Sequence, residues 1–435
     1  TMEKLFQLKK HNTNVRTEVI GGLTTFFAMA YIIFVNPNFL SQTGMDHTAV
    51  MLATCVSAAI GCFLTAFMAN VPFAQAPGMG LNAFFTYTIC FGMGYTWQQG
   101  LAIVFISGLI FLAISISPIR KQIIDSIPAP LKAAISAGIG LFICLIGLLN
   151  AGIVTAGNNL LDLSSITSGP ALLALIGLII TGILMAWKVK GALFIGILVT
   201  TVIGIPMGVT NLSNVSISFE GISIAPTFFK LSFVGLLSKG ILPLLTAIVT
   251  FAMCDCFDTV GTLIGTAGSA GMLDENGNLP RGDKALIADA VATCTGALMG
   301  TSTVTTFVES STGISEGART GLSSVVVGIL FLLGCVLAPI AGIIPSAATA
   351  PALIIVGMFM IGNVAKIDWS DVEVALPCFL TIAMMPFAYS ISDGIGFGFI
   401  SYTLIKMARG KFKEVPVLLY ILSALFVVMY ILAAL

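Results

Sequence analysis

Charged side chains are scarce in this sequence, and histidine is nearly absent. Asp, Glu, Lys and Arg together make up 9% of the 435 residues, whereas they make up roughly a quarter of a typical soluble chain. Nineteen basic and nineteen acidic residues cannot cover the surface of a soluble protein of this length, and their balance leaves no basic surface for nucleic acid. The only histidines, His11 and His47, lie in the N-terminal tail and in a predicted loop, which excludes histidine-based catalysis and zinc clusters.

The sequence also lacks the cysteine patterns that form disulfides or metal sites. Its nine cysteines all lie in apolar stretches, and no two of them form a CxxC pair, so we expect them to be buried as small hydrophobic residues. An intramembrane enzyme would need a nucleophile with its base, or a metal site, and clusters of either kind are missing. We therefore predict no enzymatic activity, no metal and no cofactor.

Apolar residues, in contrast, fill most of the chain. Hydrophobic residues account for 57% of the sequence, and the mean hydropathy is +1.06. Because a membrane-spanning helix needs roughly 20 apolar residues, a chain of this length holds about fourteen spans. We therefore predict an all-α polytopic membrane protein surrounded by a lipid bilayer, whose first apolar run is a span because no cleavage site follows it. The predicted spans cover residues 18–36, 49–69, 73–92, 100–117, 131–150, 171–187, 192–209, 240–262, 284–300, 301–318, 320–340, 348–364, 371–388 and 391–408.

The ends of the chain bear on its orientation. A further apolar stretch, 415–434, follows a basic patch and is either a fifteenth span or a segment lying at the membrane interface. Lys and Arg in short loops are enriched on the cytoplasmic side of a membrane. Nearly all of them fall on one side here if the N-terminus is cytoplasmic, with Lys230 and Lys239 as the exceptions. We therefore predict a cytoplasmic N-terminus.

Seven predicted spans in each half require the second half to insert upside down, which gives an inverted repeat typical of secondary transporters. A short echo supports this layout, because the Thr-Phe and Ala-Met of Thr25–Met29 return at Thr250–Met253, about 224 residues later. The same shift places the third predicted span on the tenth, and these two spans have the most unusual sequences in the chain.

In the third predicted span, Pro77 lies between Ala76 and Gly78, with Gly80 shortly after. Proline removes a backbone donor and pushes the preceding residue toward extended geometry. We therefore predict an extended piece at 73–76 followed by a half-helix that begins near Pro77. The alternative is an ordinary proline kink, since broken backbone at membrane depth needs protein or a water-filled cavity around it.

The tenth predicted span repeats this design. Residues 300–306 are rich in β-branched and hydroxyl side chains, which favour an extended strand. Glu309 and Ser310 then lie where a half-helix would begin, beside the positive end of its dipole. If the two extended pieces pair with each other, their half-helix ends form one polar pocket in the middle of the membrane.

The eighth predicted span contains two carboxylates, Asp255 and Asp258, on one face of the helix. A carboxylate at this depth is costly unless it is paired, protonated or solvated, so such residues are functional by default. The alternative is a pair at the end of a loop, outside the hydrocarbon. Asp255 is also a candidate to share a proton with Asp258, because two close like charges do not both ionise easily.

At these positions the sequence resembles the nucleobase–ascorbate transporter superfamily. The likeness is to its purine branch, the bacterial guanine/hypoxanthine/adenine permeases and the fungal hypoxanthine–adenine–guanine transporters, and it runs over nearly the whole chain. The motifs that carry it are TEVIGGLTT at 17–25, APGMGLNAFF at 76–85, FDTVGT at 257–262, ESSTG at 309–313 and GARTGL at 317–322.

The resemblance implies a fourteen-span inverted repeat divided into a core domain (1–122 and 240–345) and a gate domain (123–239 and 346–435). It also implies that the protein imports purine nucleobases by proton symport, with the core moving like an elevator against the gate. The expected location is the inner membrane of a bacterial cell, and a homodimer is left open. Which purine is preferred, and whether protons or sodium ions drive uptake, is not decided by the sequence.

Carried over by motif position, the resemblance also assigns roles to individual residues. Glu309 would hydrogen-bond the edge of the purine, Asn82 would select among purines, and Phe307 would stack on the base. The motif frame favours Asp258 as the more general position of the binding acid and makes Asp255 substrate-facing, without deciding between them. Asp258 and Glu309 are the predicted proton-coupling residues. The predicted substrate site as a whole is Glu309, Asp255, Asp258, Asn82, Phe307, Ser310 and, as a looser match, Phe73.

These roles agree with the chemistry of a purine base. Its edge offers N–H donors and ring-nitrogen acceptors that suit a carboxylate and an amide, and its flat face suits an aromatic ring. Two alternatives remain. One is a carrier of anions or other small solutes on the same fold, and the other is a channel. Half-helix N-termini attract anions, but an anion site would favour a Lys or Arg beside it, and Asp258 and Glu309 argue against that.

Overall fold

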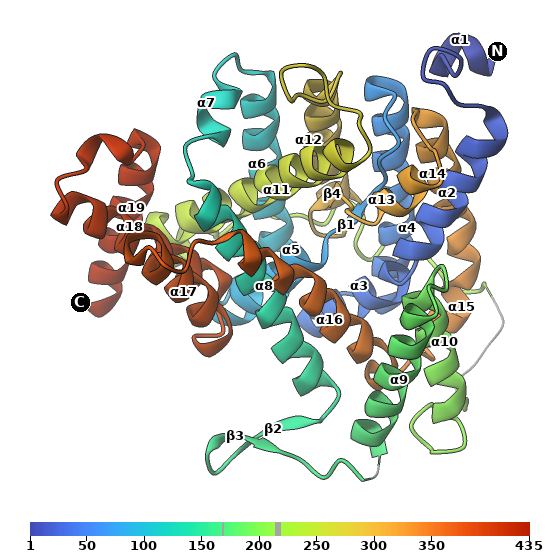
Figure 1. Ribbon diagram of the computed structural model, residues 1–435. Helices are drawn as coiled ribbons and strands as arrows, with labels where there is room; N and C mark the ends of the chain where they lie inside the picture. The colour runs from blue at the N-terminus through green and yellow to red at the C-terminus, as the bar shows by residue number, and fades with distance from the viewer. Residues whose placement is uncertain (168, 214–218) are drawn as a thin grey trace.

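The computed structural model describes residues 1–167, 169–213 and 219–435, and it is mostly helical (Figure 1). Residues 168 and 214–218, which belong to the predicted first gate segment, lie outside the described residues. The helices before residue 210 are α1 (Met2–Phe6), α2 (Val15–Met29), α3 (Ile32–Leu40), α4 (His47–Leu64), α5 (Met79–Ala83), α6 (Trp97–Ile116), α7 (Arg120–Ile124), α8 (Ala129–Asn150), α9 (Gly169–Ala186) and α10 (Ala192–Gly204). Two π-helical segments, Thr65–Ala69 and Phe84–Gly92, continue α4 and α5.

The later helices contain the longest in the chain, α11. They are α11 (Ile241–Ser269), α12 (Gly282–Met299), α13 (Ser310–Ser315), α14 (Gly321–Gly334), α15 (Ala338–Ala341), α16 (Ser346–Ile361), α17 (Val372–Phe387), α18 (Ile391–Ala408) and α19 (Val417–Ala434). Strands β2 (Val154–Gly157) and β3 (Leu160–Leu163) form an antiparallel hairpin after α8, which the sequence analysis does not predict.

Nine helical stretches of the described chain are long and apolar enough to cross a membrane, and two shorter apolar helices, α10 and α17, accompany them. This confirms a multi-pass membrane protein. The number fourteen and the seven-plus-seven layout stay predictions, because the third and tenth predicted spans are interrupted and several others are short or carry charges. Residues 415–434 form α19, which is long and apolar enough to span, but a span and an interfacial helix remain open for it.

The interrupted third and tenth spans cross each other as predicted. Strands β1 (Gln75–Pro77) and β4 (Val304–Thr306) pair antiparallel, with Gln75 opposite Thr306 and Pro77 opposite Val304. The backbone N–H of Phe307 also donates to the Ala74 carbonyl, at 2.9 Å. An ordinary proline kink is therefore wrong for the third span. Pro77 has no N–H to donate, and a strand with only one partner tolerates that loss.

Each strand leads into a half-helix, and each lies against a glycine of a neighbouring helix. Helix α5 begins after Gly78, and α13 begins after Glu309. A Cβ atom added to Gly61 of α4 would lie 2.8 Å from the Gln75 side chain, and one added to Gly296 of α12 would lie 2.8 Å from Val304. The two strands therefore pass close to the backbones of α4 and α12, which leaves no room for a side chain there.

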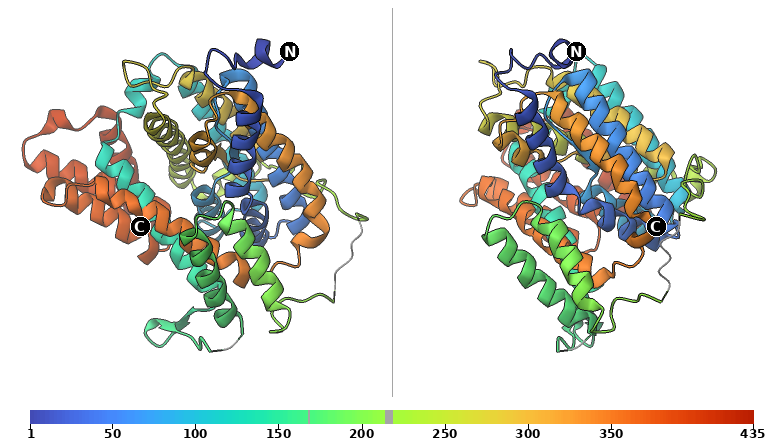
Figure 2. Two further views of the ribbon diagram at one scale, coloured as in Figure 1. Left: turned by 45° about the vertical axis from the view of Figure 1, so that its right-hand side comes forward. Right: turned by 90° about the vertical axis from the view of Figure 1, so that its right-hand side faces the viewer.

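Contacts between the helices divide the molecule into two groups (Figures 1 and 2). Helix α14 packs against α2 and α4, and α12 packs against α6 and α4, around the crossed strands. Helix α8 packs against α16 and α17, with α9, α10, α18 and α19 beside them. The grouping follows the predicted core and gate segments, but the domain boundaries themselves stay a prediction.

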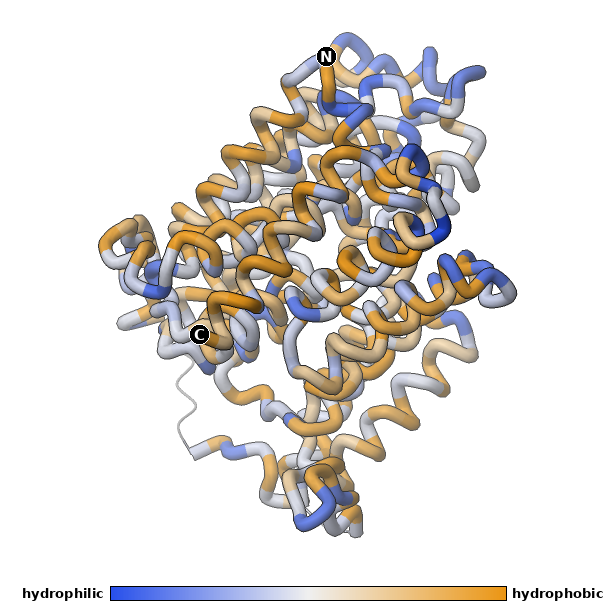
Figure 3. The backbone as a smooth tube through the Cα atoms, turned by 90° about the vertical axis from the view of Figure 1, so that its left-hand side faces the viewer, coloured by the Kyte–Doolittle hydropathy of each residue, from blue (hydrophilic) through white to orange (hydrophobic). Residues whose placement is uncertain are grey.

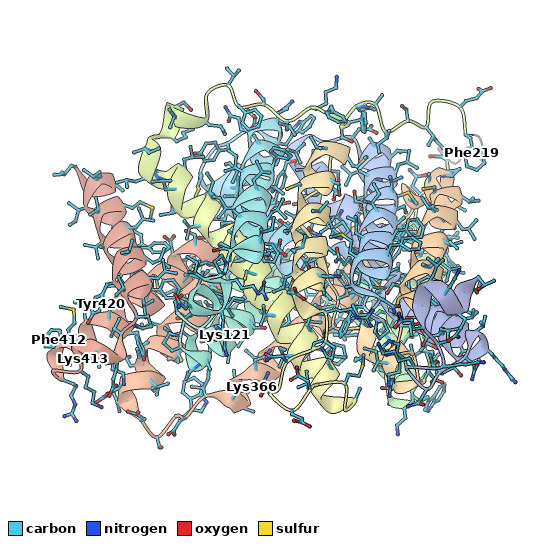
Figure 4. The ribbon with its side chains drawn as sticks, turned by 90° about the horizontal axis from the view of Figure 1, so that it is seen from above. Lys121, Phe219, Lys366, Phe412, Lys413 and Tyr420 are labelled. Atoms are coloured by element: carbon cyan, nitrogen blue, oxygen red, sulfur yellow. The ribbon has the colours of Figure 1, made fainter. Side chains whose placement is uncertain are left out.

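The outer faces of the helices are apolar, and the polar residues gather at one end. Large apolar side chains such as Leu333, Phe379 and Ile431 are exposed, as expected for surfaces that contact lipid tails. Hydrophilic residues gather around the N-terminus (Figure 3). Lys121, Lys366 and Lys413 lie toward one edge of the molecule, and Phe219 lies toward the opposite edge (Figure 4). This arrangement matches the predicted one-sided distribution of basic loops, whereas which side is cytoplasmic stays a prediction.

Candidate functional site

Glu309 lies where β4 turns into the half-helix α13. It is the residue that precedes the first turn of α13, and the first N–H groups of that helix donate to the backbone carbonyls of residues 307–309. Its carboxylate accepts a hydrogen bond from the hydroxyl of Tyr31, at 2.7 Å, and it is only half-buried. Tyr31 itself is buried and lies at the interruption between α2 and α3. The site therefore combines two broken helices.

Asp258 lies on α11 and differs from every other acidic residue of this region in being exposed. Its carboxylate makes no hydrogen bond within the part of the chain that the structure describes. Glu309 and Asp289 are the acidic groups close enough to act on it electrostatically. Asp258 directly precedes Thr259, whose hydroxyl contacts Thr305 of β4, and Glu309 follows the same strand. That the two carboxylates form one site stays a prediction.

Asp255 faces the opposite way, into the protein. It is 2% exposed and accepts a hydrogen bond of 2.7 Å from the Thr293 hydroxyl on α12. The structure pairs it with Asp289 of α12, which lies within hydrogen-bonding reach, and not with Asp258. The expectation that Asp255 and Asp258 share a proton is wrong, because residues three apart on α11 diverge enough here for one to be buried and the other exposed. A direct contact of Asp255 with substrate stays a prediction.

Asp289 fixes strand β4. Its Oδ2 atom accepts hydrogen bonds from the Thr259 hydroxyl (2.6 Å) and from the backbone N–H (2.9 Å) and hydroxyl (2.8 Å) of Thr306. Its Oδ1 atom has no hydrogen-bond donor among the described residues, and the same is true of Asp255 Oδ1. The Oδ2 atom of each carboxylate thus accepts hydrogen bonds from neighbouring residues. The Oδ1 atoms have no donor in the described chain and remain available for a contact between the two carboxyl groups.

Asn82 lies on α5 and is completely buried. Its side-chain oxygen accepts a hydrogen bond from the Ser302 hydroxyl, and its Nδ2 has no acceptor within the described chain. Beside it, Asn36 of α3 donates to the hydroxyls of Thr54 (2.7 Å) and Thr301 (2.8 Å). Asn36 therefore ties α3 to α4 and to the residues just before β4.

The remaining predicted residues hold the strand crossing. Phe307 is almost fully buried in the main apolar core, next to Glu309. Phe73 is fully buried in a separate apolar cluster with Phe111 and Ile314, so it lies apart from Phe307. The Ser310 hydroxyl accepts a hydrogen bond from the Ala74 N–H, at 2.9 Å. The structure thus gives Phe73 and Ser310 supporting positions, and their contact with substrate stays a prediction.

Three residues of this region are missing from the predicted site. Tyr31 was hidden in an apolar span, and the interruption beside it was the signal that could have revealed it. Asp289 lies in the ninth predicted span, and its sequence alone does not show which groups it contacts. Lys132 of α8 places its ammonium 5.0 Å from the ring centre of Phe257, the neighbour of Asp258, and it was overlooked because it lies near the end of a predicted span.

Comparison with known proteins identifies relatives along the whole chain. The family described as Permease family matches residues 16–397. A putative permease of Methanocaldococcus jannaschii is 46% identical over 99% of this chain and 98% of its own length. A guanine/hypoxanthine permease of Bacillus subtilis is 45% identical over 99% of both chains, and an adenine permease of Escherichia coli is 41% identical over 98% of this chain and 95% of its own.

Solved structures with similar folds are much more distant in sequence. The transmembrane domain of a cyanobacterial bicarbonate transporter superposes with a TM-score of 0.67, covers 87% of this chain and 97% of that domain, and is 17% identical. The murine anion transporter Slc26a9 in its inward-facing state also gives a TM-score of 0.67, over 90% of this chain and 68% of that one, at 10% identity. These likenesses show the fold alone. On the sequence comparisons, the chain belongs to the Permease family and, within it, to the purine branch of the nucleobase–ascorbate transporters.

Proposed function

We propose that this permease imports purine nucleobases together with protons, and that Glu309 and Asp258 form the site where base and proton are bound. The observation that carries the proposal is that both carboxylates lie beside the crossed strands. Glu309 follows β4 and is held by Tyr31, and Asp258 precedes Thr259, whose hydroxyl contacts Thr305 of β4. Relatives that are named as guanine/hypoxanthine and adenine permeases support the choice of substrate.

The two carboxylates suit the edge of a purine. A carboxylate accepts hydrogen bonds from the N–H groups of the base. The first N–H groups of α13 already donate to backbone carbonyls, so the carboxylates are the proposed polar contacts. Phe307, directly before this helix, offers an aromatic contact. We assign Asn82 an indirect role, in which its hydrogen bond from Ser302 sets the position of α5 at the rim of the site and so affects the choice among purines.

Protons provide the simplest coupling. Asp258 and Glu309 form no salt bridge with Lys or Arg in the described chain, and an unpaired carboxylate in the membrane is relieved by binding a proton. A neutral base that enters with one proton carries one positive charge inward, so the membrane potential contributes about 2.3 kcal/mol per 100 mV. The helix group around the strands would move against the group of α8 and α16–α18, as an elevator, in the inner membrane and with a cytoplasmic N-terminus.

The test is uptake of radiolabelled hypoxanthine by a bacterium without purine transporters of its own. Glu309→Gln and Asp258→Asn are expected to abolish uptake, while Glu275→Gln, in an exposed loop, is the matched control and retains it. Adenine and guanine should compete, uracil should not, and a protonophore should stop accumulation. Uptake that survives both substitutions in well-expressed protein would sink the assigned site.

A second candidate is an anion carrier, favoured by Lys132. Its ammonium lies 5.0 Å from the ring centre of Phe257, the sequence neighbour of Asp258, and supplies the positive charge that an anion site needs. The two candidates differ in one experiment. If Lys132→Gln abolishes uptake of bicarbonate or chloride and hypoxanthine is not transported, the anion carrier replaces the purine symporter.

A further inference from the structure

A cavity lies away from Glu309, where the N-terminal tail meets two loops of the fold. It has a volume of about 450 Å³, within the range of roughly 300–1,000 Å³ that is typical of small-molecule sites. The tail before α2, the loop between α11 and α12, and the loop between α13 and α14 all contribute to it. Its lining residues are His11, Asn12, Asn70, Val71, Gly271, Met272, Leu279, Pro280, Arg281, Gly317 and Arg319.

Two positively charged side chains line this cavity. They are Arg281 and Arg319, beside the His11 ring, and no acidic side chain is among the lining residues. Neither arginine forms a salt bridge with a carboxylate of the described chain. The buried Glu18 carboxylate accepts from the backbone N–H groups of Arg319 and Thr320, so it offsets part of this positive charge without pairing with either guanidinium.

The guanidinium groups are fixed and still have free donors. One nitrogen of Arg281 lies 3.2 Å from the His11 ring and 3.4 Å from the Asn70 carbonyl. One nitrogen of Arg319 donates to the carbonyls of Ile314 and Ala318, each at 2.7 Å. A guanidinium has five N–H donors, so most of them remain for a bound group.

The backbone at Arg281 is also unusual. Its φ angle is +64°, in the left-handed region that residues with side chains rarely adopt, and it directly precedes the first turn of the 18-residue helix α12. The fold holds this strained conformation and thereby directs an arginine into the recess. Conformations of this kind are concentrated at binding and active sites.

We propose that this cavity binds a phosphate monoester, carried either by a free nucleotide or by the headgroup of a lipid. A phosphate group accepts hydrogen bonds from guanidinium forks in a geometry that suits arginine better than lysine. The cavity has room for more than the phosphate, and the apolar side chains of Val71, Met272, Leu279 and Pro280 provide a wall for the group attached to it.

The half-helix α13 connects this cavity to the proposed transport site. Arg319 donates to the Ile314 carbonyl near the C-terminal end of α13, and Glu309 lies at the N-terminal end of the same helix. Occupancy of the cavity therefore changes the setting of α13 and the rate of uptake. This effect on transport rests on the proposed function, whereas binding of the phosphate does not.

Binding is tested on the purified full-length protein in a neutral detergent. The probes are guanosine 5′-monophosphate, guanosine and inorganic phosphate, measured by equilibrium dialysis. The nucleotide is expected to bind, guanosine is not, and Arg281→Gln should weaken nucleotide binding about tenfold or more. Arg120→Gln, outside the cavity, is the matched control, and Arg281→Lys should recover only part of the affinity because it keeps the charge without the fork.

A lipid source is distinguished in nanodiscs. If the phosphate belongs to a lipid, discs with phosphatidic acid should retain that lipid on the wild-type protein and lose it on Arg281→Gln, while the free nucleotide does not bind. Binding of hypoxanthine, measured on the same samples, reports an intact transport site and separates this inference from the proposed function. If hypoxanthine binds but neither phosphate source depends on Arg281, the cavity is no phosphate site.

Discussion

In the first half of the chain, the helices beside the crossed strands hold them with neutral polar groups, whereas the corresponding helices of the second half use carboxylates. The Asn36 amide donates to Thr54, and the Gln75 amide donates to Thr65. On the other side, Asp289 accepts from Thr259 and Thr306, and Asp255 accepts from Thr293. In both halves a helix side chain secures a broken span.

This difference separates the groups that hold the backbone from the groups that are proposed to bind substrate. Hydroxyls and amides are sufficient to hold a strand at membrane depth, as the first half shows. Carboxylates cost much more there, so their use beside the crossed strands in the second half indicates a task beyond holding the backbone. Asp258 and Glu309 are the two that keep solvent access, which makes them the proposed binding groups, and Asp255 with Asp289 lies behind them.

The largest effect is expected from a change at Asp258, the most exposed of these carboxylates. Asp258→Asn should reduce hypoxanthine uptake about a hundredfold, since a hydrogen bond to a charged group contributes roughly 1.5–3 kcal/mol and proton binding is lost as well. Asn36→Leu, the matched change in the neutral half, should lower stability and leave uptake per folded molecule within about threefold. Equal losses of uptake in both variants would show that the halves do not differ in function.

The next effect concerns stability. Asp289→Asn removes the charged acceptor of Thr259 and Thr306 from a buried position and should destabilise the protein by about 3 kcal/mol. Thr54→Ala, which removes the neutral counterpart, should cost only about 1 kcal/mol. Thermal unfolding of both purified variants measures the difference. A melting temperature of Asp289→Asn equal to that of wild type would remove Asp289 as the anchor of β4.

A smaller effect is expected from the contact between the halves. Tyr31→Phe removes the hydrogen bond that the first half donates to Glu309, and uptake should fall about tenfold, mainly through KM, because a hydrogen bond to a charged group contributes roughly 1.5 kcal/mol or more. Tyr420→Phe, which loses a bond to a surface carbonyl, serves as the control. Unchanged kinetics in Tyr31→Phe would mean that Glu309 is positioned by α13 alone.

The smallest effect concerns an acid in a cluster of ion pairs away from the proposed site. Glu373, at the start of α17, pairs with Lys411, Lys406 and Arg409. Glu373→Gln should therefore leave the pH profile of uptake between pH 5 and 8 unchanged. A shifted profile would assign part of the pH dependence to the periphery.

The sequence predicted the crossing of the strands because its causes are local. Pro77 and its neighbouring glycines favour an extended backbone, and so does the run of β-branched residues before Thr306. An extended backbone inside an apolar fold needs hydrogen-bonding partners, and few are present other than the second extended piece. Glu309 and Asp258 were predicted as a site because unpaired acids are rare in apolar spans.

The contacts across the fold were less predictable. Asp255 and Asp258 are three residues apart, but which of them is buried depends on where α12 lies, and spacing does not fix that. Tyr31 looks like any aromatic residue of an apolar helix until α13 brings Glu309 to its hydroxyl. Arg281 and Arg319 stand in different loops, and only the folded chain brings them to one cavity with His11.

The most direct test of the account is the electrical response of proteoliposomes to hypoxanthine in sodium-free buffer. The account predicts an inward positive current on addition of hypoxanthine to the wild-type protein. The current should be absent in Glu309→Gln and Asp258→Asn and retained in Glu275→Gln. Hypoxanthine uptake without any current, or a current that appears only when sodium is added, would contradict proton coupling at these two carboxylates.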